Sequence, residues 1–183
     1  MHCWKTINLE QKYGDYYIIA ASLLTMILSF IFLYLPLSFV FNIDNVKSGS
    51  LWIFLFILIT IYPVHNAIHI VFIFLLRVKF TIQVRKRTIF LFFPIYIYEP
   101  IAKWKYVTCL LMPFLFINSL ILFALFQFPS YFHYITFILS FHLGICVSDF
   151  IYLKWLRKSP KNCFIEETDE GYQILTVSHS EES

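Results

Sequence analysis

Charged side chains are scarce in this sequence: they make up 14% of its 183 residues, whereas 60% are hydrophobic and 21% aromatic. The mean hydropathy is +0.73, and a soluble domain of this size does not need so much apolar side chain. The few basic residues flank apolar runs instead of forming a separate basic face, which argues against nucleic acid as a partner. The composition therefore indicates an integral membrane protein that has the lipid bilayer as its surroundings.

Closely spaced cysteine pairs are also lacking. The four cysteines are Cys3, Cys109, Cys146 and Cys163, and no two of them form a Cys-x-x-Cys pair. This spacing supports neither a disulfide framework nor a cysteine zinc site. Cys109 and Cys146 fall within apolar runs, where a small buried thiol is the expected role.

Long apolar runs, in contrast, fill most of the chain. Four of them are predicted as transmembrane helices, over residues 16–41, 51–76, 106–128 and 131–153. Each is longer than the ~20 residues that cross a hydrocarbon core. The predicted class is an all-α membrane protein with a four-helix transmembrane domain over residues 1–162.

The basic residues predict the orientation, because Lys and Arg favour the cytoplasmic side. The loop from Arg77 to Lys105 holds seven of them, the segment 154–161 holds four, and the N-terminal segment holds Lys5 and Lys12. The two remaining loops hold only Lys47. Both termini and the middle loop are therefore expected in the cytoplasm.

Two segments outside the spans have strand-like patterns. Residues 80–98 alternate around the basic turn Arg85–Arg87, which predicts a β-hairpin at the membrane surface; an amphipathic interfacial anchor is the alternative. Residues 163–183 predict a short cytoplasmic β-hairpin followed by a polar tail.

The second span carries two histidines, His65 and His69, which lie four residues apart and so share one helix face. This is the spacing of the first two ligands in a His-x-x-x-His zinc site. In catalytic sites of that type a glutamate follows the first histidine and takes a proton from the metal-bound water. Asn66 stands there instead, and an amide cannot accept and return a proton. The alternative is that the two histidines only form hydrogen bonds between helices.

Asp149 is the only acid within a predicted span, where a carboxylate costs a few kcal/mol. His69 and Asp149 each lie 18 residues from the outer end of their spans, so both reach a depth of roughly 27 Å. A cluster of His65, His69 and Asp149 is therefore expected as a zinc site with an open fourth position. His142 is a further candidate: it could be a ligand, an outer partner of a ligand, or a buried neutral histidine bonded to a carbonyl.

Several segments carry a resemblance to a known family. They are His65–His69, Pro100 with the run 104–113, and the block 144–149 that continues through 156–160 to 164–167. In their order and spacing they resemble the DUF3267 group of small bacterial membrane proteins, which are described as zincin peptidases and are similar to site-2-type intramembrane metalloproteases. The resemblance implies Zn²⁺ held by His65, His69 and Asp149, a membrane-associated hairpin after the histidine helix, and the bacterial cytoplasmic membrane as the location.

The departure from that family pattern is Asn66, which stands in place of the catalytic glutamate. The expected function is that of an impaired zincin-type metallopeptidase homologue, either silent or very slow, which acts by binding a transmembrane protein partner. Two alternatives remain. One is a small ion-binding or transport protein whose histidines and Asp149 line a polar path. The other is a structural membrane protein whose polar residues only join helices.

Overall fold

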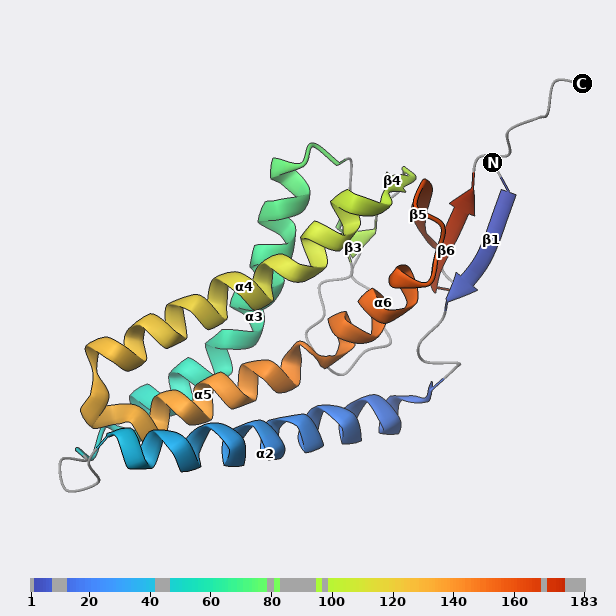
Figure 1. The fold of residues 1–183 in the computed structure, drawn as a ribbon. Coiled ribbons are helices and arrows are strands. Elements are labelled where there is room, and N and C mark those ends of the chain that lie inside the picture. The colour runs from blue at the N-terminus through green and yellow to red at the C-terminus, as the bar shows by residue number, and fades with distance from the viewer. Residues whose placement is uncertain are drawn as a thin grey trace, which may run out of the picture.

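The computed structural model describes residues 2–7, 13–41, 47–78, 81–82, 95–96, 99–168 and 171–176. Most of these residues are helical, and the long helices run as a bundle with a small sheet at one end (Figure 1). The helical elements are α2 (Asp15–Val40), α3 (Leu51–Leu75), α4 (Lys103–Gln127), the 3₁₀ turn η2 (Pro129–Tyr131), α5 (Phe132–Ile145) and α6 (Val147–Arg157).

Among the described residues, three helices are long and apolar enough to cross a membrane: α2, α3 and α4, with their spans at Tyr16–Val40, Leu51–Leu75 and Lys103–Gln127. Large apolar side chains such as Phe32, Trp52 and Phe123 are exposed on them. An exposed apolar surface of this extent is what lipid, and not water, requires of a helix. These helices are consistent with an integral membrane protein.

The fourth predicted span, 131–153, is not one straight helix. It consists of the η2–α5 segment (Pro129–Ile145) and α6, which are bent by 43° at their junction, so that the pair counts as one span only if a broken span is allowed. The ψ angle of −7° at Cys146 departs from the helical value of about −42° and marks the break. The apolar pattern continues through this point, which is why the sequence alone predicts an uninterrupted helix.

In addition to the helices of the predicted all-α class, the described residues form a four-stranded antiparallel sheet. Its order is β1 (His2–Ile7), β6 (Gly171–Thr176), β5 (Cys163–Thr168) and β4 (Ile101–Ala102). The C-terminal strand segments pair with each other, with Ile165 opposite Ile174. The sequence patterns of β1 and β4 do not predict strands. Both are strands only because β6 and β5 offer them partners from distant parts of the chain.

Of the predicted hairpin over residues 80–98, only two short pieces belong to the described residues. They are β2 (Thr81–Ile82) and β3 (Ile95–Tyr96), which pair antiparallel. The remainder of this predicted hairpin, and the predicted tail over 178–183, lie outside the described residues.

Two apolar clusters occupy different levels of the bundle. The cluster nearer the sheet includes Ile73 of α3 and Leu110 of α4, together with Ile165 and Ile174 of the sheet. The other cluster consists of buried isoleucines at positions 61, 117 and 138. His65 and His69 lie between Ile61 and Ile73 along α3, so the polar residues of the bundle sit between two apolar layers.

The close packing of α2 on α5 gives a testable prediction. A Cβ atom at Gly144 would lie 2.9 Å from the Ser22 carbonyl oxygen and 3.2 Å from Met26 Cβ. Gly144→Ala should therefore push α2 away and lower the unfolding free energy by about 1–3 kcal/mol, which thermal unfolding in detergent would measure. Gly49→Ala is the matched control, because the added Cβ there meets the Tyr134 ring, a side chain that can move. Equal melting temperatures for the two variants would contradict this account of the α2–α5 contact.

Candidate metal centre

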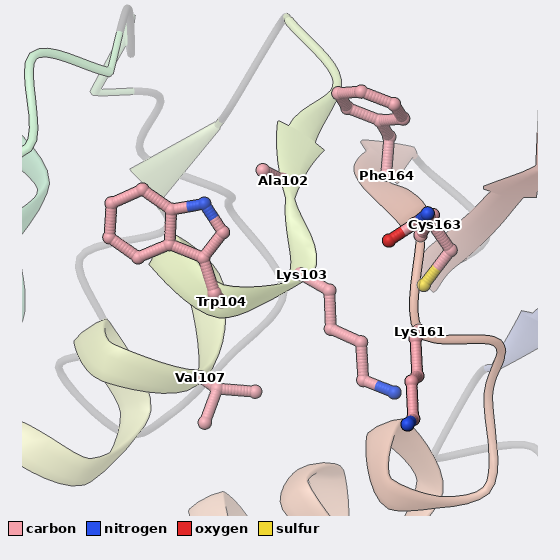
Figure 2. Close-up of a pocket in the computed structure, with 8 residues that line it drawn as sticks. Ala102, Lys103, Trp104, Val107, Lys161, Cys163 and Phe164 are labelled. Atoms are coloured by element: carbon pink, nitrogen blue, oxygen red, sulfur yellow. The ribbon is translucent and has the colours of Figure 1, made fainter.

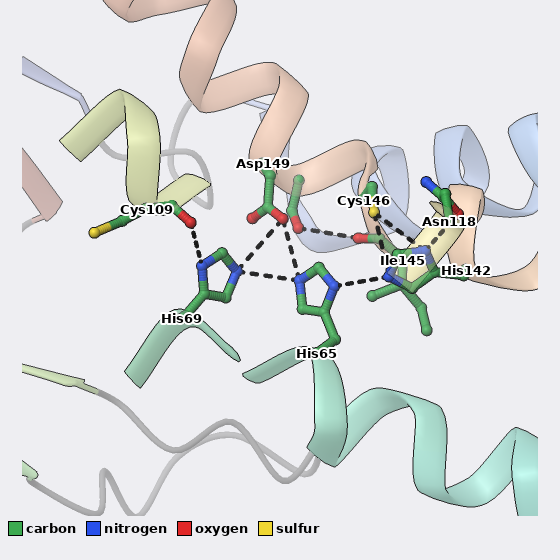
Figure 3. Close-up of polar contacts among 9 residues, drawn as sticks. His65, His69, Cys109, Asn118, His142, Ile145, Cys146 and Asp149 are labelled. Atoms are coloured by element: carbon green, nitrogen blue, oxygen red, sulfur yellow. Dashed lines mark hydrogen bonds and ion pairs between the residues drawn. The ribbon is translucent and has the colours of Figure 1, made fainter. Parts of the chain in front are cut away.

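Three side chains from two helices meet in the middle of the bundle (Figure 3). His65 and His69 come from the same face of α3, one turn apart, and Asp149 comes from the first turn of α6. His65 Nε2 lies 3.1 Å from Asp149 Oδ2 and 3.1 Å from His69 Nε2. The third side of the triangle, from His69 Nε2 to Asp149 Oδ2, is 3.5 Å. The three residues expected from helix spacing and depth are thus brought together.

The size of this triangle suits a tetrahedral metal ion. Zinc binds imidazole nitrogen and carboxylate oxygen at about 2.0–2.2 Å, so two ligand atoms of a tetrahedral site are separated by about 3.3–3.6 Å. The three distances in the cluster are 3.1, 3.1 and 3.5 Å. These values place the donor atoms at, or within a few tenths of an ångström of, the separation that a shared zinc ion imposes.

The cluster is largely enclosed. The His65 side chain is 4% exposed, whereas those of Asp149 and His69 are 12% and 15% exposed. The inward oxygen Asp149 Oδ2 is itself buried. Three protein ligands are the number found in catalytic zinc centres, in contrast to the four of the structural type.

His69 has its outer nitrogen held by the backbone of α4. Its Nδ1 lies 2.9 Å from the carbonyl oxygen of Cys109. In a regular helix the N–H of residue 113 would bond to that carbonyl, but Pro113 has no N–H to give. The oxygen can only accept, so Nδ1 of the neutral His69 ring carries the proton and Nε2 presents its lone pair to the cluster.

His65 has its outer nitrogen held by a second histidine. Its Nδ1 lies 3.1 Å from His142 Nε2, and His142 Nδ1 lies 2.9 Å from the amide oxygen of Asn118. The amide oxygen accepts a hydrogen bond from His142 Nδ1–H, so His142 Nε2 is the acceptor of the neutral ring. His65 Nδ1–H therefore donates to His142, and His65 Nε2 presents its lone pair to the cluster.

The hydrogen bonds outside the cluster thus leave only lone pairs inside it. When both rings are neutral, two imidazole nitrogens and one carboxylate oxygen converge with their lone pairs facing one another, at 3.1, 3.1 and 3.5 Å. Such a convergence is repulsive unless a cation, either a proton on one ring or a metal ion, fills it. Metal-ligating histidines characteristically donate their other N–H to a carbonyl or another acceptor, and both His65 and His69 do so. The donor set and its protonation fit Zn²⁺.

A second group of potential ligands lies on the other side of His65. It consists of His65, His142 and Cys146, and all three are buried. The Cys146 sulfur lies 3.7 Å from His142 Nε2. This group, however, contains no carboxylate and is buried throughout, whereas the other group contains Asp149, and His69 and Asp149 are partly exposed. The group around Asp149 is therefore the better metal site.

Comparison with protein families is in line with a zinc site. Residues 58–164, more than half of the chain, match the family DUF3267, described as "Putative zincin peptidase". The chain belongs to the DUF3267 family. The matched region contains all of the cluster residues, and it ends within β5. Neither the curated proteins nor the solved structures gave a match.

Position 66 of this DUF3267 chain corresponds to the glutamate of the His-Glu-x-x-His zinc pattern. Asn66 follows His65 on α3 and is partly buried. Its side chain lies within hydrogen-bonding contact of Tyr62, one turn earlier on the same helix. Its Nδ2 atom has no hydrogen-bond partner among the described residues. An amide at this position can orient a polar group but cannot carry a proton through a reaction.

Two further histidines of α5 lie at the edge of the cluster (His142) and outside it (His133). His142 does not pair with a backbone carbonyl; it lies between His65 and the side chain of Asn118. His133 lies outside the cluster, and its Nδ1 has no hydrogen-bond partner among the described residues. The sequence analysis assigned no role to Asn118 or Pro113. Pro113 could have been recognised from the sequence, because a proline inside a helix leaves the carbonyl four residues earlier without its usual N–H partner.

An open hollow of about 420 Å³ lies apart from the cluster, where β5 meets the start of α4 (Figure 2). It shares no lining residue with the cluster. The Lys103 ammonium group donates hydrogen bonds to the carbonyls of Ser159 and Pro160, at 2.8 and 3.2 Å. This lysine joins the start of α4 to the end of α6, so its role in this DUF3267 chain is to fix the two helices that carry Cys109 and Asp149.

Proposed function

We propose that this chain is a zincin-type membrane protein that holds Zn²⁺ with His65, His69 and Asp149. It lacks the glutamate base at position 66 and is a silent or very slow relative of the peptidases. Its role is then to bind a segment of a transmembrane protein partner at the metal site. The single observation that carries the proposal is the convergence of His65, His69 and Asp149, with the outer nitrogens of both histidines already held by hydrogen bonds.

The chemistry of an active relative explains why position 66 decides the activity. A bound zinc ion acts as a Lewis acid and makes water nucleophilic near neutral pH. Peptide hydrolysis also needs a side chain that takes a proton from the water and returns it to the leaving amine. Asn66 cannot do this, and loss of a positioned general base costs about 10²–10⁴-fold in rate.

The membrane arrangement that we propose has four spans, with the bent α5–α6 pair as the fourth and both termini in the cytoplasm of a bacterium. The sheet end of the bundle carries most of the described basic residues. Lys105, at the start of α4, donates a hydrogen bond to the Leu76 carbonyl at the end of α3 over 3.1 Å. His69 lies seven residues before Leu76, which puts the cluster about 10 Å from this end. The positive charges at that end support its cytoplasmic location.

A partner in the membrane suits this position better than a soluble one. The cluster lies between two apolar layers of the bundle, and its more exposed side chains are those of His69 and Asp149. A polypeptide that reaches these side chains must cross apolar surface. The ligand expected at the site is therefore a segment of a membrane protein whose backbone carbonyl can approach the metal.

Metal content is the experiment that tests the proposal. The protein purified in detergent without chelators should contain close to one zinc per chain by elemental mass spectrometry, and His65→Ala/His69→Ala should contain none. His133→Ala is the matched control, because it removes a histidine from the same bundle but outside the cluster, and it should retain zinc. Wild-type protein that stays free of zinc even after incubation with excess Zn²⁺ would overturn the metal site.

A further inference from the structure

We infer that Pro113, His142 and Asn118 are positioning residues that hold both ligand histidines in the one tautomer that can bind metal. The inference rests on the metal site proposed above. A neutral imidazole binds a metal through the nitrogen that carries no proton. In this bundle the choice is made outside the cluster, by two separate hydrogen-bond paths that end on α4.

The first path acts on His65 and passes through α5. Asn118 is 8% exposed, and His142 is fully buried, so water cannot replace either partner. The Asn118 amide oxygen accepts from His142 Nδ1–H over 2.9 Å, and His142 Nε2 accepts from His65 Nδ1–H over 3.1 Å. The orientation of one amide thereby fixes the proton positions in two rings. If the acceptor at position 118 were lost, His142 could change tautomer and would no longer oblige His65 to keep its proton on Nδ1.

The second path acts on His69 and exists because Pro113 has no backbone N–H. Pro113 is fully buried within α4 and cannot bond to the Cys109 carbonyl four residues earlier. That oxygen accepts from His69 Nδ1–H over 2.9 Å. A proline inside a membrane helix normally reduces its stability, and a neighbouring side chain that uses the freed carbonyl compensates for this. Here the compensating side chain is a proposed metal ligand.

The test measures zinc affinity and the ring tautomers separately. Zinc dissociation constants would come from competition with a chromophoric chelator in detergent. The tautomers would come from ¹⁵N NMR of the histidine rings in the metal-free protein. Asn118→Leu should weaken zinc binding by about 10–100-fold, the range for outer partners of metal ligands. It should also change the ¹⁵N signals of His65 from those of one Nδ1–H tautomer to those of a mixture of the two tautomers.

Two further variants separate positioning from packing. Asn118→Asp keeps an acceptor of the same shape and should keep zinc affinity within about threefold, because His142 Nδ1–H still has its partner. Ser140→Ala is the control for loss of a buried polar group: its hydroxyl bonds only to the Thr136 carbonyl among the contacts found for it, so zinc affinity should not change. A loss in all three variants would show a general packing effect and overturn the inference.

Pro113→Ala gives a result that a merely structural role would not produce. The alanine N–H can bond to the Cys109 carbonyl and should raise the melting temperature of the helix bundle. The same N–H competes with His69, so zinc should bind more weakly, by less than about tenfold because a carbonyl has two lone pairs. Unchanged zinc affinity in both Asn118→Leu and Pro113→Ala, with unchanged tautomers, would refute the inference while the metal site stands. Absence of zinc from the wild type would instead refute the proposed function, and the NMR signals would still report whether the two paths exist.

Discussion

Asp149→Asn is expected to weaken zinc binding by more than about 100-fold and, at the same time, to leave the metal-free protein at least as stable as the wild type. The first effect follows because a carboxylate ligand is lost, which exceeds the 10–100-fold cost of losing an outer partner. The second follows from the lone pairs of His65 and His69. When both rings are neutral, the asparagine amide can donate a hydrogen bond to one of these nitrogens, which the carboxylate cannot do.

Thermal unfolding with and without zinc would measure both effects. Free Zn²⁺ at 100 times its dissociation constant stabilises the native state by about 2.7 kcal/mol, or about 5–10 °C for a chain of this length. The wild type should show this shift, and Asp149→Asn should not. Asp149→Glu is a useful companion, because it keeps the carboxylate but moves it by one methylene.

The same measurement tests the structural alternative. If Asp149 only formed an ion pair with a protonated His65 or His69, removal of its charge would leave a buried cation without its partner. That change typically costs about 3–5 kcal/mol. A large drop in the melting temperature of metal-free Asp149→Asn, together with a wild type that does not respond to zinc, would therefore favour a structural role over a metal site.

The cluster could be predicted from the sequence because it depends on regular geometry. Four-residue spacing puts His65 and His69 on one face, and counting residues along the spans puts Asp149 at their level. The break at Cys146 lies only three residues before Asp149, so it changes the direction of α6 without changing this level much. Local periodicity and depth thus suffice to identify the three residues.

The partners outside the cluster could not be predicted, because they depend on how the helices pack. On a straight helix, His142 would lie about 10 Å further from the cytoplasm than Asp149. In the structure the two residues lie on opposite sides of the same ring, with His142 at Nδ1 of His65 and Asp149 at Nε2. The sequence places Asn118 within the third span, but not opposite α5.

The sheet was missed for a related reason. β1 and β6 pair with Cys3 opposite Leu175, from the two ends of the chain. β4 comprises only Ile101 and Ala102, and no pattern of two residues predicts a strand. These pairings arise from tertiary structure, since the ends of α4 and α6 bring the segments together. Sequence reasoning finds the long elements and the site between them, but not the short strands that join the bundle ends.

Asn66→Glu is expected to convert the proposed binding protein into a peptidase, or to raise a slow activity by about 10²–10⁴-fold, because it restores the missing general base. Position 66 directly follows His65 on α3, where the zincin pattern places the base. The side chain there is partly buried, and no hydrogen bond to its Nδ2 among the described residues would be lost. A carboxylate within a span costs a few kcal/mol, so the variant should be less stable than the wild type although it loses no hydrogen bond at Nδ2.

The measurement is cleavage of fluorogenic transmembrane peptides in detergent or liposomes, with zinc content determined on the same samples. Asn66→Gln is the matched control, since it has the length of glutamate but still cannot accept a proton, and it should remain inactive. Adding His69→Ala to Asn66→Glu should abolish both zinc and cleavage. If Asn66→Glu retains zinc but cuts none of the peptides, then the base is not the only part that is missing. The geometry of the site would then support binding but not hydrolysis.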